Sequence, residues 1–430
     1  PEKAAIPTQV TTLHRLLGSR PGSRSFRHNE DNPLPLDILV IDEASMVDVD
    51  LMASVFAALP DKARLIMLGD KDQLASVDAG AVLGELCQRA EGAHYLPETA
   101  QWLQAVTGCQ LPSGLLDSGG LALDQAVAML RKSYRFDEHS GIGVLASATN
   151  AGQLSRELIG QCRNQGFEDV AWLTGEIDMG WLASHALTGS PERFHNQGEQ
   201  RVVGTTPVEP PVGYGHYLKL IRDRKPATDV EANGRESWDA WATEVLAAFN
   251  RFKVLCALRQ GPFGVEGLNR DIAGRLHGAG LIERTEGWYA GRPVLITGND
   301  YNLGLMNGDI GITLSVPWDR NDEGEPVETL RVAFPSGDGS GGVRWISPSR
   351  LQSMETVYAM TVHKSQGSEF THACLVIPDR LTPVLTRELV YTGITRARHW
   401  LSLAVCQEGV LKEAVGRSVI RASGLAGLLA

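Results

Sequence analysis

Acidic residues follow two short aliphatic runs near the start of the chain. Asp42 and Glu43 come directly after the run at 36–41, and Asp70 follows the run at 64–68. Nucleotide hydrolysis needs one carboxylate to hold Mg²⁺ and a second to orient and deprotonate the attacking water. Adjacent acids that leave a strand supply both groups. An acidic pair after a strand is also a common helix N-cap, so this pair alone leaves the two interpretations about equal.

A polar side chain, Gln73, follows the second run within the segment 69–74. At the end of a neighbouring strand, its amide would sense the γ-phosphate of a bound nucleotide. A simple turn is the more frequent explanation of such a segment when it is taken alone.

The segment 361–370 concentrates hydrogen-bond donors. Thr361, His363 and Lys364 supply a hydroxyl, an imidazole and an ammonium group ahead of Gly367. A glycine there lets the backbone approach a phosphate closely. The alternative is a surface loop that leads into a buried strand, and the density of donors favours the phosphate site.

Two arginines, Arg396 and Arg398, end the segment 391–398. An arginine aimed at the γ-phosphate stabilises the charge that develops during phosphoryl transfer. Residues two apart face different directions on a helix. One arginine is therefore expected to reach a nucleotide while the other forms a structural salt bridge.

The elements that must position these groups are buried parallel strands. The runs at 36–41 and 64–68 flank a helical pattern at 46–59, which predicts a β-α-β unit. A right-handed crossover places both strand ends at one edge of the sheet, where ligands of open α/β sheets bind. The two acidic segments are therefore expected in one crevice.

The second half of the chain repeats this α/β pattern around an insert. A helix is predicted at 236–250, strands at 253–258, 372–377 and 400–405, and a helix at 386–398. Between 288 and 349, short β-like runs alternate with turns rich in Gly, Asn and Asp, which predicts a small antiparallel barrel. The predicted domains are 1–125, a second domain of 126–287 with 350–430, and the inserted barrel at 288–349.

Composition narrows the class of protein. The formal net charge is -11, whereas a protein that binds nucleic acid mainly through a basic surface is usually basic, so any DNA contact is expected in a local groove. Charge alone favours an ordinary acidic soluble protein. Six cysteines lie far apart without a CxxC pair, which is typical of a reducing cytoplasm rather than a disulfide framework. No apolar run reaches the roughly 20 residues that span a bilayer, so no membrane association is expected.

The order of the motifs resembles that of superfamily 1 helicases. The stretches DEAS, GDKDQL, SYRF, TVHKSQGSEF and YTGITRAR follow one another as helicase motifs II to VI do. Thr11–Gly18 and Leu255–Gly264 also resemble RecD proteins, the α subunits of exodeoxyribonuclease V. The resemblance implies two RecA-like parallel-sheet lobes, the first incomplete, with an SH3-like β-barrel inserted in the second.

The resemblance also implies roles for individual residues. Asp42 would hold Mg²⁺, Glu43 would be the catalytic base, and Gln73 would sense the γ-phosphate of ATP. Tyr134 would stack near the adenine, Arg135 would touch the γ-phosphate, and Arg396 would be the arginine finger. The resemblance also implies that Glu369 and Gly367 lie near the nucleotide. The residues implied to contact the DNA backbone are His14, Thr361, His363 and Lys364.

Members of this family move 5′ to 3′ along single-stranded DNA and work with RecB-like and RecC-like subunits in break repair and recombination. The phosphate-binding motif GxxxxGK[ST] does not occur in the 430 residues. The chain is expected to start after that loop and to hydrolyse ATP only at background rates. The alternatives are a stand-alone RecD-like or relaxase-type helicase, and a non-catalytic module that binds DNA or a partner.

Overall fold

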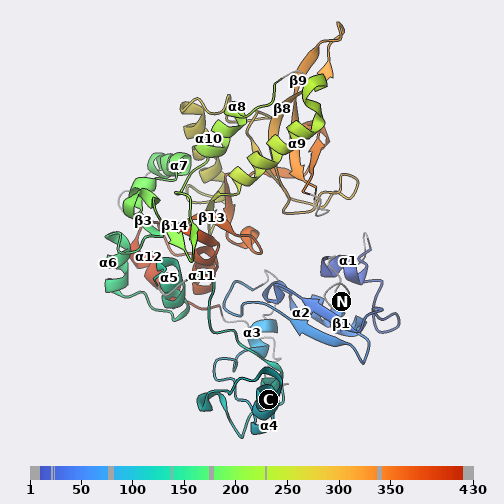
Figure 1. Ribbon diagram of the computed structural model, residues 1–430, viewed down its shortest axis with the longest axis vertical. Coiled ribbons are helices and arrows are strands. Elements are labelled where there is room, and N and C mark those ends of the chain that lie inside the picture. The colour runs from blue at the N-terminus through green and yellow to red at the C-terminus, as the bar shows by residue number, and fades with distance from the viewer. Residues whose placement is uncertain are drawn as a thin grey trace. The chain divides into compact units, whose positions relative to one another are not determined.

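The computed structural model describes residues 10–20, 23, 25–75, 82–136, 139–173, 179–227, 230–336 and 341–419. These residues form two compact units, one that runs to Ser133 and includes Val419, and one that comprises Tyr134–Ser418. Figure 1 shows the elements of both units. The boundary lies beyond residue 125, where the sequence predicted the first domain to end.

The first unit is built on a β-α-β arrangement, as predicted. Strands β1 (Ile38–Ile41) and β2 (Arg64–Met67) pair in parallel, and α2 (Val49–Ala58) connects them. The side chain of Asp48 caps α2 by accepting a hydrogen bond from the amide of Leu51 at 2.7 Å. The remaining helices of this unit are α1 (Leu13–Leu17), α3 (Val82–Leu86), α4 (Pro97–Thr107), η2 (Ala44–Met46), η3 (Ser113–Leu115) and η4 (Leu123–Ala126).

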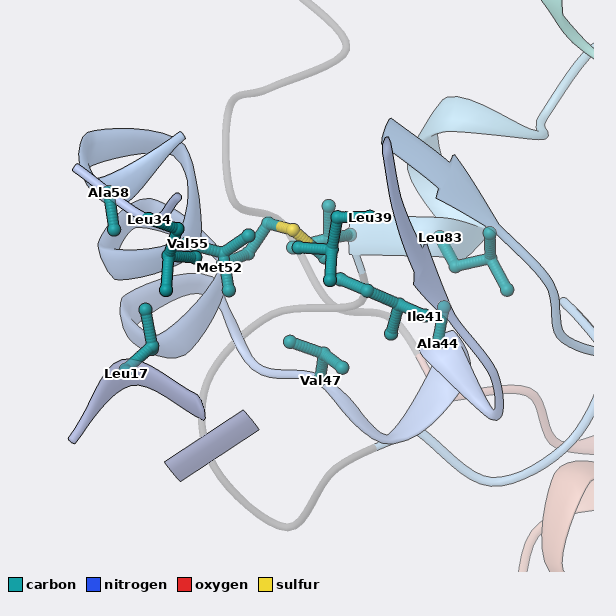
Figure 2. Close-up of a cluster of buried hydrophobic side chains, with 11 residues drawn as sticks. Leu17, Leu34, Leu39, Ile41, Ala44, Val47, Met52, Val55, Ala58 and Leu83 are labelled. Carbon is teal, nitrogen blue, oxygen red and sulfur yellow. The ribbon is translucent and has the colours of Figure 1, made fainter. Parts of the chain in front are cut away.

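One face of this small sheet carries the core of the unit, and the other face is bare. Leu39 and Ile41 of β1 pack with side chains of α2 and with Leu83 of α3 (Figure 2). On the opposite face, exposed apolar side chains alternate with the buried ones, because successive residues of a strand point to opposite sides. These exposed residues are Ile38 (57 %), Val40 (53 %), Ile66 (45 %) and, just after β2, Leu68 (49 %).

The second unit centres on a five-stranded, wholly parallel sheet with the order β12-β6-β13-β14-β3. Its strands are β12 (Ala359–Thr361), β6 (Phe252–Cys256), β13 (Phe370–Ile377), β14 (Ala397–Val405) and β3 (Val170–Leu173). The sequence predicted β6, β13 and β14 but not the short strands β3 and β12. Together with the first unit, this confirms an α/β fold with parallel sheets.

Helices and a small hairpin surround this sheet. The α-helices are α5 (Gly141–Asn150), α6 (Arg156–Arg163), α7 (Met179–Thr188), α8 (Gly215–Asp223), α9 (Val230–Phe249), α10 (Val265–Gly278), α11 (Arg387–Thr395) and α12 (Glu408–Gly416). The short elements are η5 (Pro191–Arg193), η6 (His195–Gly198), η7 (Pro348–Arg350), η8 (His363–Ser365), and the hairpin of β4 (Val202–Val203) with β5 (Thr206–Pro207). Helix α11 packs against α5, α12, β13 and β14, and the chain enters β14 directly from it.

The insert forms an antiparallel sheet with the order β10-β9-β8-β7-β11. Its strands are β7 (Pro293–Ile296), β8 (Ile310–Arg320), β9 (Pro326–Pro335), β10 (Val343–Ile346) and β11 (Met354–Thr356). Helix α9 packs on β8, β9 and β10. The sheet extends past residue 349, and no pairing joins β10 to β11 among the described residues. Closure into an SH3-like barrel therefore stays a prediction.

Among the described residues, none of the helices combines the length and the hydropathy that crossing a bilayer requires.

Candidate functional site

The acidic pair of the first unit sits in a turn that the two strand ends fix. The amide of Leu68 donates to the carbonyl of Ile41, and the amide of Ala44 donates to the carbonyl of Leu68, both at 2.8 Å. Asp42 is exposed and Glu43 is half-buried. Glu43 adopts a left-handed backbone conformation with φ of 52°, and its amide donates to Asp42 Oδ1 at 2.9 Å. The turn thus holds Asp42 and Glu43 directly after the end of β1, with the Asp42 carboxylate fixed by the amide of Glu43.

Helix capping does not account for this pair. Glu43 precedes the short helix η2, but its side chain makes no capping hydrogen bond there. The cap of α2 is Asp48, further along the chain. Capping of η2 by its side chain therefore does not explain the presence of Glu43.

The second acidic segment packs directly against the first. A Cβ atom added to Gly69 would lie 2.7 Å from Leu83 Cδ2 and 3.1 Å from the amide nitrogen of Ala44, so a larger residue there would have to push Leu83 and the Ala44 backbone aside. Asp70 then organises the turn, because its Oδ2 accepts from Gln73 Nε2 at 3.1 Å and its Oδ1 accepts from the amide of Asp72 at 3.0 Å. Gln73 lies in a turn, as the simpler interpretation held, and Asp70 orients its amide.

A magnesium ion would find few protein ligands here. No group of three or more His, Cys, Asp or Glu side chains suited to a metal occurs in the part of the chain that the structure describes. Mg²⁺ commonly keeps several waters and binds through one or two carboxylates together with substrate phosphates. The exposed carboxylate of Asp42 fits that pattern as a single ligand.

His14, the DNA contact implied in this unit, lies on α1. Its side chain is exposed, and its ring meets that of Phe26 edge-on with 5.8 Å between centroids. The side chain of Thr12 caps the helix by accepting from the amide of Arg15 at 3.3 Å. His14 is thus an accessible imidazole on a short, capped helix.

In the second unit, three predicted residues meet at the amino edge of the parallel sheet. Arg135 forms an ion pair with Glu369, and its Nη1 donates to the carbonyl of Thr395 at 2.9 Å. Arg396 is only 3 % exposed. Its Nη1 donates to the carbonyl of Ser368 at 3.1 Å, and its Nε donates to the carbonyl of Thr392 at 3.3 Å.

The strand starts explain why these residues converge. Glu369 immediately precedes β13 and Arg396 immediately precedes β14, and the two strands are neighbours. The amide of Phe370 donates to the carbonyl of Arg396 at 2.9 Å, which ties the two starts together. Gly367 has φ of 73°, which favours glycine, and Tyr134 is 89 % exposed beside Arg135.

The predicted DNA contacts of this unit lie at the other end of the sheet. Thr361 is the last residue of β12 and pairs with Cys256 of β6. Cys256 also pairs with Val376 near the carboxyl end of β13, so Thr361 and Val376 lie at the same height in the sheet. At about 3.3 Å per residue, that level lies about 20 Å along β13 from its start. The segment 361–370 therefore crosses from one end of the sheet to the other instead of forming one cluster.

The groups at this carboxyl end are tied to the antiparallel sheet. Thr361 is 7 % exposed, and its Oγ1 accepts from the amide of Lys364 at 3.3 Å. Lys364 Nζ pairs with Glu355 Oε1 at 2.6 Å, and Arg259 Nη2 pairs with Glu355 Oε2 at 3.1 Å. His363 is half-buried at the start of η8. Sequence reasoning assigned no role to either partner: Arg259 lies within the RecD-like stretch Leu255–Gly264 but was not singled out there, and no motif marks Glu355.

Comparison with known proteins adds two kinds of match. The family description "AAA domain" matches residues 2–79, and "UvrD-like helicase C-terminal domain" matches residues 356–404. The RecBCD enzyme subunit RecD of Haemophilus influenzae is 36 % identical over 99 % of this chain and 59 % of its own length. RecD of Mycobacterium tuberculosis is 34 % identical over 97 % of this chain and 57 % of its own.

The ATP-dependent RecD2 DNA helicase of Deinococcus radiodurans is 27 % identical over 90 % of this chain and 39 % of its own length. This chain thus spans less than two thirds of the curated relatives it matches. Among solved structures, Bacteroides Pif1 bound to single-stranded DNA covers 97 % of this chain and 82 % of its own, with 13 % identity and a TM-score of 0.42.

Proposed function

We propose that this chain is the motor part of an ATP-dependent 5′-to-3′ DNA helicase. The reason is that the chain belongs to the RecD-type helicases of superfamily 1. In this proposal it works in double-strand break repair and recombination within a RecBCD-type helicase and nuclease. The RecD subunits of Haemophilus influenzae and Mycobacterium tuberculosis are 36 % and 34 % identical to this chain and match it over 59 % and 57 % of their length. RecD2 is 27 % identical over 39 % of its length, so the subunit form is preferred over a stand-alone helicase.

The observation that carries the proposal is the amino edge of the second unit. Arg135, Glu369 and Arg396 come from three separate segments of the sequence and meet where β13 and β14 begin. Guanidinium groups held in fixed positions are suited to the charge that spreads over a phosphoryl group during transfer. A structural role alone would not require these residue types in three helicase-like motifs.

Each residue has a part in the proposed reaction. When bound, MgATP supplies the phosphoryl group and the cation that neutralises its oxygens. Asp42 would hold the metal and Glu43 would take the proton of the attacking water. In the remaining roles, Gln73, Arg135 and Arg396 would contact the γ-phosphate, and Tyr134, Glu369 and Gly367 would lie near the nucleoside.

We also propose that this chain alone hydrolyses ATP only at background rates. The loop that cradles β- and γ-phosphates, GxxxxGK[ST], does not occur in the sequence. The bare face of Ile38, Val40 and Ile66 supports this, since parallel sheets are normally covered on both faces. In the working protein, further elements that carry the phosphate loop would cover that face.

An ATPase assay tests both proposals. The chain alone would be compared with the same chain joined to the part of a RecD relative that lies outside the match. We expect hydrolysis stimulated by single-stranded DNA only in the joined protein, and at least about a hundredfold loss in its Glu43→Gln variant. DNA-stimulated turnover by the chain alone would contradict the inactivity, and full turnover by Glu43→Gln would contradict the assigned base.

For the DNA, we propose that His14, Thr361, His363 and Lys364 contact the backbone of a single strand. For partners, we propose RecB-like and RecC-like subunits, with the antiparallel sheet at 293–356 as a barrel-like wedge or docking element. Co-expression with RecB and RecC of Haemophilus influenzae and purification through a tag on RecC would show a three-chain complex. Recovery of RecB and RecC without this chain would favour the stand-alone form.

A further inference from the structure

A pocket of about 490 Å³ opens at the amino edge of the parallel sheet in the second unit. Arg251 lies just before β6, Thr371 lies at the start of β13, and Arg398 and His399 lie at the start of β14. The β4–β5 hairpin forms the remaining wall. This volume lies within the roughly 300–1,000 Å³ that is usual for small-molecule sites. None of the lining residues is among those assigned above to the nucleotide or the DNA.

The pocket gathers positive charge in a protein whose formal net charge is -11. Arg398 is exposed, and within the described residues its side chain has neither a hydrogen bond nor an ion pair. The side chain of Arg251 is 21 % exposed and pairs with Glu209 Oε2 at 2.6 Å. Guanidinium groups on one wall of a pocket fit the oxygens of a phosphate, often with two hydrogen bonds each.

Glu209 indicates what kind of group the pocket accepts. Its carboxylate is the only acidic side chain that lines the pocket, and the side chain is 73 % exposed. A carboxylate oxygen of Glu209 therefore occupies the guanidinium group of Arg251, while the rest of the Glu209 side chain is mostly in water. An exposed ion pair of this kind contributes little stability, so a more highly charged anion can displace it.

The imidazole of His399 completes the lining. Burial lowers the pKa of His399 to about 4, with the charges of Arg398 and Arg201 acting in the same direction, so the ring is neutral near pH 7. Its Nδ1 is buried and has no hydrogen-bond partner among the described residues. Buried polar atoms are usually satisfied by a protein group, water or a bound molecule. The neutral ring therefore offers a hydrogen bond without adding charge.

We propose that this pocket binds a phosphate group, carried by a nucleotide or by the end of a DNA strand, between Arg251 and Arg398. Glu209 occupies Arg251 when the phosphate is absent and leaves it when the phosphate binds. The hydroxyls of Thr371 and Thr206 line the same pocket and can donate to the remaining phosphate oxygens. This site goes beyond the proposed hydrolysis of ATP and does not depend on it.

Isothermal titration calorimetry of the purified chain tests this site. The probes are inorganic phosphate, dAMP, and an oligothymidylate with a 5′-phosphate or a 5′-hydroxyl. We expect Arg398→Gln to weaken phosphate binding about tenfold, because one charge-assisted contact is lost. Glu209→Gln is expected to strengthen binding severalfold, because Arg251 no longer has a competing carboxylate.

The matched control is Arg380→Gln. Arg380 is equally a surface arginine, its side chain is 80 % exposed, and it follows the opposite end of β13. This variant removes the same charge and should leave binding unchanged. Tighter binding of the 5′-phosphorylated strand than of dAMP would identify DNA as the source of the phosphate, and the reverse order would identify a nucleotide.

Three results would overturn the proposal. One is that none of the probes binds to the wild-type chain. Another is that Arg398→Gln and Arg380→Gln bind equally well. The third is that Glu209→Gln binds no more tightly than the wild type. Since Arg398 and Glu209 are both exposed, thermal melting should confirm that these variants fold as the wild type does.

Discussion

The two ends of the parallel sheet in the second unit hold their charged groups in different ways. At the amino edge, Arg396 donates to two backbone carbonyls, and Arg135 donates to a third while pairing with Glu369. At the carboxyl end, Lys364 and Arg259 share one carboxylate, that of Glu355 on the neighbouring antiparallel sheet. The first arrangement is anchored in the backbone and the second only in side chains.

This difference separates a preorganised site from an exchangeable one. Backbone carbonyls cannot move away without disturbing β13 or α11, so Arg396 keeps its place before a ligand arrives. Preorganised charge lowers a reaction barrier because little reorganisation is needed during the reaction. An ion pair near the surface is weak by itself. Lys364 can therefore exchange Glu355 for a DNA phosphate at little cost.

Replacing Arg396 tests the preorganised end and should have the largest effect. In the chain joined to the missing part of a relative, Arg396→Ala should lower the rate of ATP hydrolysis about a thousandfold, as loss of an arginine finger does. Arg396→Lys keeps the charge but not the planar fork, so it should remain well below the wild-type rate. Steady-state ATPase assays measure both variants. A wild-type rate for either would remove Arg396 from the reaction.

Lys253 of β6 is a third kind of basic side chain, because it is buried and neither a hydrogen bond nor an ion pair to its Nζ occurs among the described residues. Its side chain is 0 % exposed, Nζ lacks a hydrogen bond among the described residues, and it lies 3.6 Å from the centroid of the Phe249 ring. Burial lowers the pKa of Lys253 well below its usual value. The folded chain therefore binds fewer protons than the unfolded chain at any pH between the lowered pKa and the ordinary one.

Stability should consequently rise with pH across that window, and fall as pH decreases toward the lowered pKa of Lys253. The slope is at most about 1.4 kcal/mol per pH unit. Lys253→Met should remove this component and raise the free energy of unfolding at pH 7 by about 1–4 kcal/mol. Urea unfolding at pH 7 and 9 measures both effects. Lys412→Met, at a half-exposed lysine, is the control, and an unchanged slope in Lys253→Met would refute the prediction.

The exchangeable end should give the smallest effects. Lys364→Gln should weaken the binding of single-stranded DNA severalfold and reduce the dependence of log affinity on log salt by about one. Glu355→Gln should strengthen binding severalfold, because it releases Lys364 and Arg259. Fluorescence anisotropy at several salt concentrations measures these changes. If Glu355→Gln weakened binding, the carboxylate would be a structural anchor and the contrast between the two ends would fail.

The sequence correctly predicted the strands that are marked by a continuous run of aliphatic residues. The aliphatic runs around α2 predicted β1 and β2 correctly, and backbone hydrogen bonds join the two strand ends that the acids follow. Strands β3 (Val170–Leu173) and β12 (Ala359–Thr361) were missed. Each has only three or four residues, and their positions are set by pairing with β14 and β6, which no short window of sequence records.

The site was predicted by residue type but not by location. Thr361 and Glu369 are close in sequence, and their motif suggested a single cluster. The chain between them instead travels from the carboxyl end of the sheet to its amino edge. The partner of Lys364, Glu355, lies on β11 and is determined by the docking of two sheets. Such long-range contacts cannot be inferred from the order of motifs.

The bare side of the β1–β2 sheet has a practical consequence for handling the protein. Ile38, Val40, Ile66 and Leu68 form an exposed apolar patch on a sheet whose outer edges pair with no further strand among the described residues, a combination that promotes self-association. The purified chain should bind hydrophobic dyes and scatter light increasingly as it is concentrated. Mild detergent should suppress both signals, and a Val40→Lys change on this surface should raise the usable concentration without disturbing the residues packed beneath it.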